Sequence, residues 1–209
     1  MPKKANTCKY SPETALQFRT AVIASLLATL KERSHSSEAA LQRYEVALQY
    51  ASHAEVDDGV IGRLFELVSM APLSKKAWVA RQGRTDCYVR LAKPDGKVAY
   101  EPAEAKTNGG RIGSLYERNH PKFVVYGMAV CNTAVPTGRL LQPVVMATEQ
   151  FLELLSEVGA LKSTNGAHPE VAIQASSKAL YEALLAYGEN TGLWFDPERI
   201  YDPSEFATN

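Results

Sequence analysis

Two acids and a lysine in residues 85–108 have types and spacing that suit metal-assisted chemistry. Asp86 opens one strand-like run, and Glu104 and Lys106 lie two residues apart at the end of the next. Carboxylate oxygens are the ligands that hard divalent cations such as Mg²⁺ prefer. A cation held there polarises a phosphate and generates hydroxide, while a neighbouring lysine orients water and stabilises developing charge. The segment therefore predicts metal-dependent phosphodiester hydrolysis.

A β-hairpin is the element that must position these residues. Residues 93–97 contain Pro, Asp and Gly at positions that favour a tight turn. If the two strands pair directly from the ends of that loop, Asp86 stands opposite Glu104, and cross-strand Cβ atoms lie about 4.5–5.5 Å apart. Because strand side chains alternate, Glu104 and Lys106 share a face. We expect all three groups on one face of the hairpin.

This register has one defect, which concerns Glu101 and Pro102. It places Glu101 on the core face and Tyr100 on the acidic face. Pro102 cannot donate to a strand ladder and favours an edge or a bulge. A bulge near 101–102 would restore the apolar pattern, but it would shift the partner of Asp86 by one residue. Both registers stay open on the sequence alone.

The pattern of Asp86, a β-turn and then Glu104-x-Lys106 resembles the PD-(D/E)XK nuclease superfamily, which includes many restriction endonucleases. The resemblance covers residues 57–135, about a third of the chain. It implies an α-β-β-β-α-β core, with the first acid near the start of the second strand and the E-x-K on the third. Thr85 stands where the family name has Pro. The literal pair Pro94-Asp95 lies in the turn, and we interpret it as turn chemistry.

The same resemblance implies a role for each site residue. Asp86, Glu104 and the carbonyl of Ala105 would bind Mg²⁺, with Mn²⁺ as a substitute. Lys106 would position the attacking water or help to deprotonate it. Glu66, on the helix before the sheet, either completes the metal site or is a surface glutamate.

Candidate substrate contacts lie on either side of the hairpin. Asn108, Gly109 and Arg111 follow the lysine directly, and Arg84 precedes the first acid. Adjacent glycines let backbone N–H groups approach a phosphate, and arginine contacts phosphates or bases. An ordinary loop explains the same residues equally well. Further basic residues are interleaved with aromatic ones around the first two strands, where they could follow a nucleic-acid backbone: Lys75, Lys76, Arg81, Arg90, Trp78 and Tyr88. A solvated face of the sheet explains these residues just as well.

Composition limits the protein class. The chain has 209 residues, of which 45% are hydrophobic and 22% charged, as in globular proteins. The formal net charge is zero, which weakens the case for nucleic acid without removing it. Three widely spaced cysteines give no disulfide framework, so we expect a cytoplasmic protein with reduced thiols. No apolar run reaches membrane-spanning length, and we expect no membrane association.

The predicted fold class is α+β, with a restriction-endonuclease-like core, an N-terminal helical hairpin and C-terminal helices. We divide the chain into a helical region, 1–56, packed on a nuclease-like core, 57–209. We expect the tail, 192–209, to cross the surface without regular structure. The expected helices are 14–32, 36–54, 57–70, 112–119, 148–158 and 168–187, and the expected strands are 77–82, 85–91, 98–107, 123–131 and 140–145. Thr148 is expected to cap the helix 148–158.

These observations predict a Mg²⁺-dependent endonuclease that hydrolyses DNA and acts in restriction–modification or a related process. A homodimer is an expectation by analogy with the family, with the N-terminal helices as its interface. One alternative is a catalytically inactive nuclease-fold protein that binds nucleic acid or a protein partner. Another is an unrelated α+β interaction protein in which the E-x-K is fortuitous.

Overall fold

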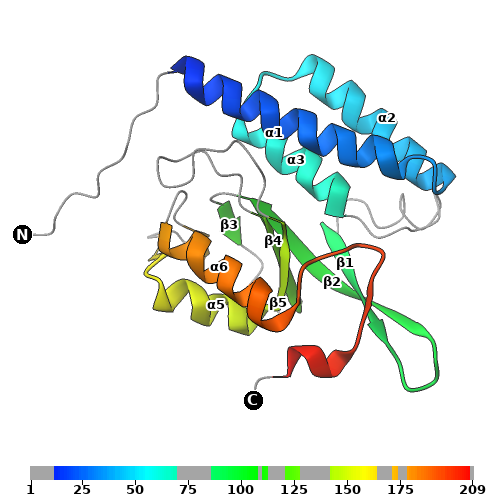
Figure 1. Cartoon of the computed structure of the whole chain (residues 1–209), viewed down its shortest axis with the longest axis vertical. Helices are drawn as coiled ribbons and strands as arrows, with labels where there is room; N and C mark the ends of the chain where they lie inside the picture. Colours follow the sequence, from blue (N-terminus) through cyan, green and yellow to red (C-terminus); the bar gives the residue numbers. More distant parts are fainter. Residues whose placement is uncertain are drawn as a thin grey trace, which may run out of the picture.

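The computed structural model describes residues 12–69, 86–107, 110–112, 121–127, 142–163, 171–173 and 178–207. Within them the chain is a mixed α+β protein, built around a five-stranded sheet with helices on both sides (Figure 1). The expected strand 77–82 and the rest of the expected helix beyond Ile112 lie outside these residues. Ile112 itself ends a strand.

Three N-terminal helices form one layer: α1 (Pro12–Arg33), α2 (Glu38–His53) and α3 (Asp58–Ser69). Local chemistry sets their starts. Pro12 stands first in α1, Ser37 accepts a hydrogen bond from the Ala40 amide at 3.1 Å, and Asp57 accepts one from the Val60 amide at 2.9 Å. The helices expected at 14–32, 36–54 and 57–70 are thus confirmed to within a few residues.

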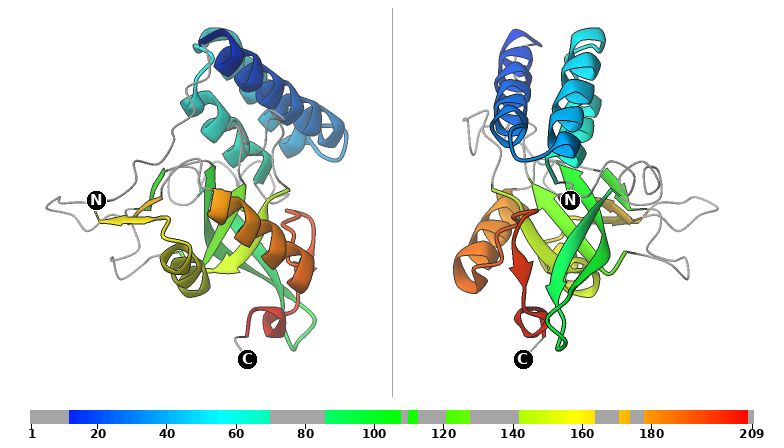
Figure 2. Two further views of the ribbon diagram at one scale, coloured as in Figure 1. Left: turned by 60° about the vertical axis from the view of Figure 1, so that its left-hand side comes forward. Right: turned by 90° about the vertical axis from the view of Figure 1, so that its right-hand side faces the viewer.

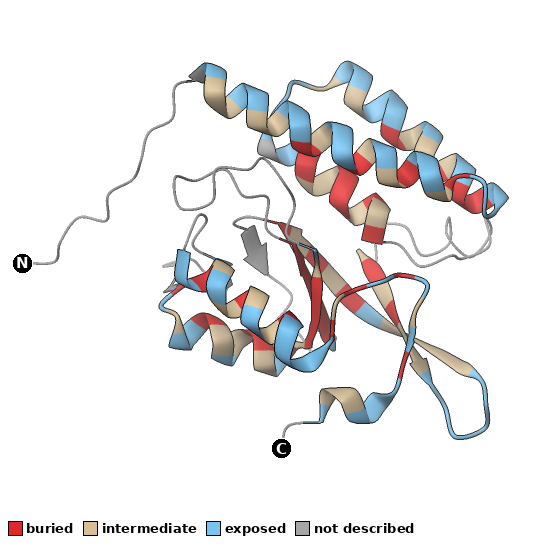
Figure 3. Ribbon diagram, viewed as in Figure 1, coloured by how far each residue is buried: buried red, intermediate tan, exposed pale blue. Residues whose placement is uncertain are grey.

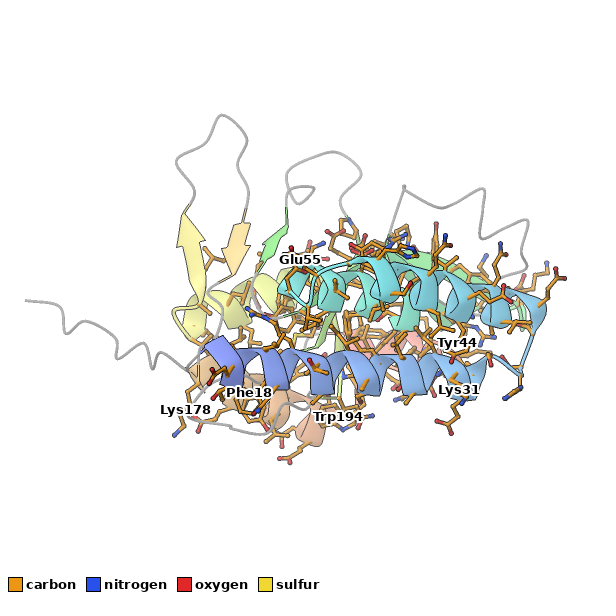
Figure 4. The ribbon with its side chains drawn as sticks, turned by 90° about the horizontal axis from the view of Figure 1, so that it is seen from above. Phe18, Lys31, Tyr44, Glu55, Lys178 and Trp194 are labelled. Carbon is orange, nitrogen blue, oxygen red and sulfur yellow. The ribbon has the colours of Figure 1, made fainter. Side chains whose placement is uncertain are left out.

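Helices α1 and α2 lie side by side above α3, as seen from above in Figure 4. Tyr44 of α2 lies between the first two helices and packs on the core. Helix α3 faces the sheet with Leu64 and Phe65, both buried. It is therefore the element through which the helical layer contacts the strands.

The main sheet has the order β5-β4-β2-β1-β8. Its strands are β1 (Cys87–Ala92), β2 (Val98–Thr107), β4 (Phe123–Gly127), β5 (Val144–Ala147) and β8 (Ile200–Tyr201). Strands β1 and β2 form the antiparallel hairpin, and β2 pairs in parallel with β4. A second, small sheet joins β3 (Gly110–Ile112), β7 (Val171–Ile173) and β6 (Leu161–Ser163).

Each face of the main sheet has its own core, visible as buried segments in Figure 3. One face carries Cys87, Val89 and Ala105 towards α1, α3 and the tail. The other carries Val124 and Tyr126 towards α5 (Thr148–Glu157) and α6 (Lys178–Thr191). This division leaves the second face of the β1–β2 hairpin for the residues that pack in neither core.

The hairpin has the direct register, without a bulge. Pairing runs one to one from Ala92 and Val98 to Cys87 and Ala103. Pro102 fits because amides alternate in direction along a strand: the Ala105 N–H points to the β1 side, so the Pro102 nitrogen points to the β4 side. There β4 begins only opposite Ala103, so no ladder bond is lost.

Three other predictions need correction. The expected strand 140–145 is shifted, since β5 begins at Val144 and continues to Ala147. Thr148 does not cap the next helix but is its first residue, and its hydroxyl donates to the Pro121 carbonyl at 2.6 Å. The expected helix 168–187 is wrong at its start, because Val171–Ile173 is strand β7 and the helix begins at Lys178.

The tail is more ordered than expected. It contains β8 and a short 3₁₀ helix, η2 (Pro203–Phe206). Tyr201 is fully buried, its hydroxyl donates to the Trp194 carbonyl at 3.0 Å, and it accepts from the Asp196 amide at 2.8 Å. Figure 2 shows the tail running beside the hairpin. It belongs to the core of the molecule.

Candidate active site

The register of the hairpin brings the two predicted acids together. Asp86 directly precedes β1, and continuing the ladder beyond Cys87 and Ala103 places it opposite Glu104. The side chain of Asp86 holds this end of the hairpin, since its Oδ2 accepts a hydrogen bond from the Ala105 amide at 3.1 Å. The backbone of β2 therefore fixes where this carboxylate lies.

Lys106 joins the two acids. Its Nζ lies 3.2 Å from Asp86 Oδ2 and 2.6 Å from Glu104 Oε1. The two carboxylate oxygens are therefore no farther apart than the sum of these distances, within the reach of about 6 Å that one shared cation requires. The three side chains retain between 19% and 23% exposure, so the cluster is open to a molecule from outside.

The environment of the cluster disfavours the negative charge of Glu104. Burial raises the pKa of Glu104, and the charge of Asp86 raises it further; Lys106 opposes both effects only in part. The ammonium of Lys106 is disfavoured by burial, but the charges of Asp86 and Glu104 outweigh this and raise its pKa. At neutral pH the lysine is consequently held in its charged form.

The main chain adds a further oxygen. The N–H and C=O of a strand residue point to the same side of the strand. The carbonyl of Ala105 therefore faces the side on which Asp86 lies. Two carboxylates and a carbonyl form a set of hard oxygen donors of the kind that Mg²⁺ and Mn²⁺ accept.

Glu66 is near enough for its charge to contribute to the raised pKa of Glu104, but its carboxylate is bound by Arg63 on the same helix, at 2.7 Å. In the part of the chain that the structure describes, no group of three or more His, Cys, Asp and Glu side chains is arranged to hold a metal ion. The residues that could hold one are thus Asp86 and Glu104 with the Ala105 carbonyl, and Glu66 lies beside them in an ion pair.

Cys87, next to the first acid, takes no part in the site. It is buried, it points into the opposite core, and burial together with the nearby acids raises the pKa of its thiol. A thiol in that state is a poor nucleophile. Cysteine chemistry is therefore excluded at this position.

Of the predicted substrate contacts, Asn108, Gly109 and Arg84 lie outside the described residues. Arg111 lies in β3, opposite Ala172 of β7, and its side chain is not among those described. The roles assigned to these four residues stay predictions.

Aromatic residues continue the acidic face along the hairpin. Tyr88 pairs with Pro102, and Arg90 pairs with Tyr100, all on the side that carries Glu104. The guanidinium of Arg90 lies 6.0 Å from the centre of the Tyr100 ring. The two-residue alternation that places Tyr100 beside the acids is visible in the sequence, where it reads as a defect of the register rather than as part of a site.

No family model, curated protein or solved structure matched this chain in the three comparisons made. Among the described residues, none of the helices has both the length and the apolar character needed to cross a membrane.

Proposed function

We propose that the chain is a metal-dependent endonuclease that hydrolyses phosphodiester bonds in DNA, with a restriction-endonuclease-like core. The observation that carries the proposal is the convergence of Asp86, Glu104 and Lys106 on one partly open face of the hairpin. The parallel pairing of β2 with β4 next to the antiparallel hairpin is compatible with the core that the resemblance implies.

Each residue has a distinct task in this mechanism. Asp86, Glu104 and the Ala105 carbonyl would hold Mg²⁺, which when bound would polarise the phosphate and activate water. Without a bound metal, the charges of Asp86 and Glu104 raise the pKa of Lys106 and keep it protonated. In the mechanism Lys106 would donate a hydrogen bond to the attacking water or to the developing negative charge, or would help to deprotonate the water.

Binding of a divalent cation between Asp86 and Glu104 requires Lys106 to move. In the structure its ammonium lies between the two carboxylates, where it supplies the positive charge that a cation would otherwise supply. Lysine has a long flexible side chain, so Nζ can leave one acid while it remains near the other. Asp86 is also held by the Ala105 amide and keeps its place when the ammonium swings away.

The same observation favours a second candidate. If Lys106 neutralises the acids permanently, the chain is a catalytically inactive nuclease-fold protein that binds nucleic acid or a protein partner. The two candidates differ in one property, which is cleavage that depends on a divalent cation.

The test uses purified full-length protein with supercoiled and linear DNA. We expect cleavage with Mg²⁺ or Mn²⁺ and none with EDTA. Glu104→Gln keeps the shape of the side chain but removes its charge, and we expect a loss of activity of at least about a hundredfold. Lys106→Ala should have a similar effect.

Glu101→Gln is the matched control. Glu101 lies on the same strand, but it faces the other side of the sheet and pairs with Lys122 at 2.8 Å. This variant should cleave as the parent does. Cleavage that persists in EDTA, or in Glu104→Gln, would overturn the mechanism, and absence of cleavage under every metal condition would favour the inactive alternative.

A further inference from the structure

The acidic face of the hairpin extends into a strip of flat and apolar side chains. Beyond the pair Asp86 and Glu104, its next rung is Tyr88 with Pro102, and the following rung is Arg90 with Tyr100. Strand β8 widens this last rung, because Ile200 pairs with Arg90.

Of the described helices, none covers this strip. On this side of the sheet, α5 packs on β4 and β5 and α6 packs on β5, and both lie away from the hairpin in Figure 1. Pro102 is exposed, and Ile200 on the edge strand retains 46% exposure. The side chains of Tyr88 and Tyr100 are half-buried, and with Pro102 and Ile200 they give the hairpin a partly exposed aromatic and apolar strip that leads to the acids.

Its dimensions select one form of nucleic acid. Rungs on one face of a strand are two residues, or about 6.8 Å, apart. Bases in B-form DNA are held at about 3.4 Å along each strand, whereas an unpaired strand can open to the wider spacing.

The charge of the protein points the same way. The formal net charge is zero, so the molecule as a whole supplies little long-range attraction to DNA. Stacking of bases on aromatic rings is worth about 1–3 kcal/mol per base and needs no net charge. On the strip Arg90 places one cation beside the Tyr100 ring, so the ring can contact a base while the guanidinium contacts its phosphate.

We propose that the DNA enters this site as a single strand, with bases stacked on the rungs of Tyr88 and Tyr100 and the backbone led towards Asp86 and Glu104. The inference rests on the proposed function for its substrate class. It adds that unpaired DNA is bound in preference to duplex, and that the strip is the surface that makes the distinction.

Binding is measured apart from cleavage. The full chain carrying Glu104→Gln is titrated in EDTA against a labelled oligothymidylate of about 12 nucleotides, and against the same strand annealed to its complement. Fluorescence anisotropy should show tighter binding of the single strand.

Two substitutions at one position isolate stacking. Tyr100→Phe keeps the aromatic ring and should keep the affinity. Tyr100→Leu keeps apolar volume without a π face and should weaken binding about 5- to 100-fold. Tyr50→Leu is the control, since Tyr50 is a 42% exposed tyrosine on α2; it should bind as the parent does.

The outcomes separate this inference from the proposed function. Equal or tighter binding of duplex, or equal binding by Tyr100→Leu and Tyr100→Phe, overturns the strip as a single-strand platform even if the protein cleaves DNA. Stacking-dependent binding of the single strand supports the strip even if no metal condition gives cleavage. Circular dichroism of each variant confirms that the fold is retained.

Discussion

At the scale of the residue, the cluster places Glu104 where its negative charge is disfavoured. Burial and Asp86 raise the pKa of Glu104, so the folded protein binds a proton there more tightly than the unfolded chain does. Glu104 thus favours folding while it is protonated, and this contribution is lost as the pH rises through the folded-state pKa. Ionisation of Glu104 therefore lowers the stability of the folded protein, and a loss of stability of this kind is common where a group serves a function.

Glu104→Gln should therefore make the protein more stable at neutral pH, because the amide is never ionised. The gain in melting temperature over the parent should shrink as the pH falls from about 7 to about 4, where the carboxylate of the parent is increasingly protonated. Thermal unfolding followed by circular dichroism measures both. Glu101→Gln, which breaks a rim ion pair, should show no such gain; a less stable Glu104→Gln at neutral pH would contradict the electrostatic account.

The sequence predicted the shared face of Asp86, Glu104 and Lys106 because strand alternation and turn chemistry are local properties. It did not predict that Lys106 would lie between the two acids, since that depends on a side-chain torsion and on the distance across the hairpin. The sequence also placed Tyr100 on this face, but we interpreted that position as an argument against the direct register and not as part of a site.

At the scale of the element, two of the predictions that failed involve very short strands. β7 has three residues and β8 has two, too few for any periodicity to show. Each is a strand only because a distant partner pairs with it: β3 and β6 for β7, and β1 for β8. The predicted helix is present from Lys178 onwards. Its predicted start at residue 168 was wrong because that range includes strand β7.

The contact between β4 and α3 depends on a glycine. A Cβ on Gly127 would lie 2.7 Å from the ring of Phe65, which is 1% exposed. Gly127→Ala should therefore destabilise the protein by about 1–3 kcal/mol through overpacking. Because Phe65 precedes Glu66 on α3, the change should also disturb the helix nearest the acids.

Gly62, in the interior of α3, provides the opposite case. A Cβ there meets nothing among the described residues within 4 Å, and alanine is the better helix former by up to about 1 kcal/mol. Gly62→Ala should be as stable as the parent or more so. Chemical denaturation compares the two variants, and a tolerated Gly127→Ala would show that Phe65 has room to move.

At the scale of the whole molecule, the described helices lie on both faces of one sheet, and the tail closes it. Leu193, Phe195 and Tyr201 are all buried in the core shared with α1 and α3. The first and last thirds of the chain are thus packed together, and the hairpin with its acids is held between them. The N-terminal helices reach the sheet chiefly through α3.

Removal of the tail should therefore prevent folding. A chain that ends at Gly192 loses three buried apolar side chains and the partner of β1. Each loss of this kind costs about 2–5 kcal/mol, against a total stability of about 5–15 kcal/mol for most domains. A chain that ends at Ala207 keeps every tail contact described here and should fold. Soluble yield and near-ultraviolet circular dichroism compare the two.

The pairing of β8 with β1 also governs how the protein is made. The hydrogen bond from Arg90 to the Glu198 carbonyl spans 108 residues, so the outer edge of β1 has no partner until Ile200 and Tyr201 of β8 leave the ribosome. At about 5–20 residues per second, this edge stays open for several seconds in every round of synthesis. An open strand edge recruits other chains. Until β8 pairs with it, each newly made copy therefore exposes a strand edge on the hairpin that carries the acids.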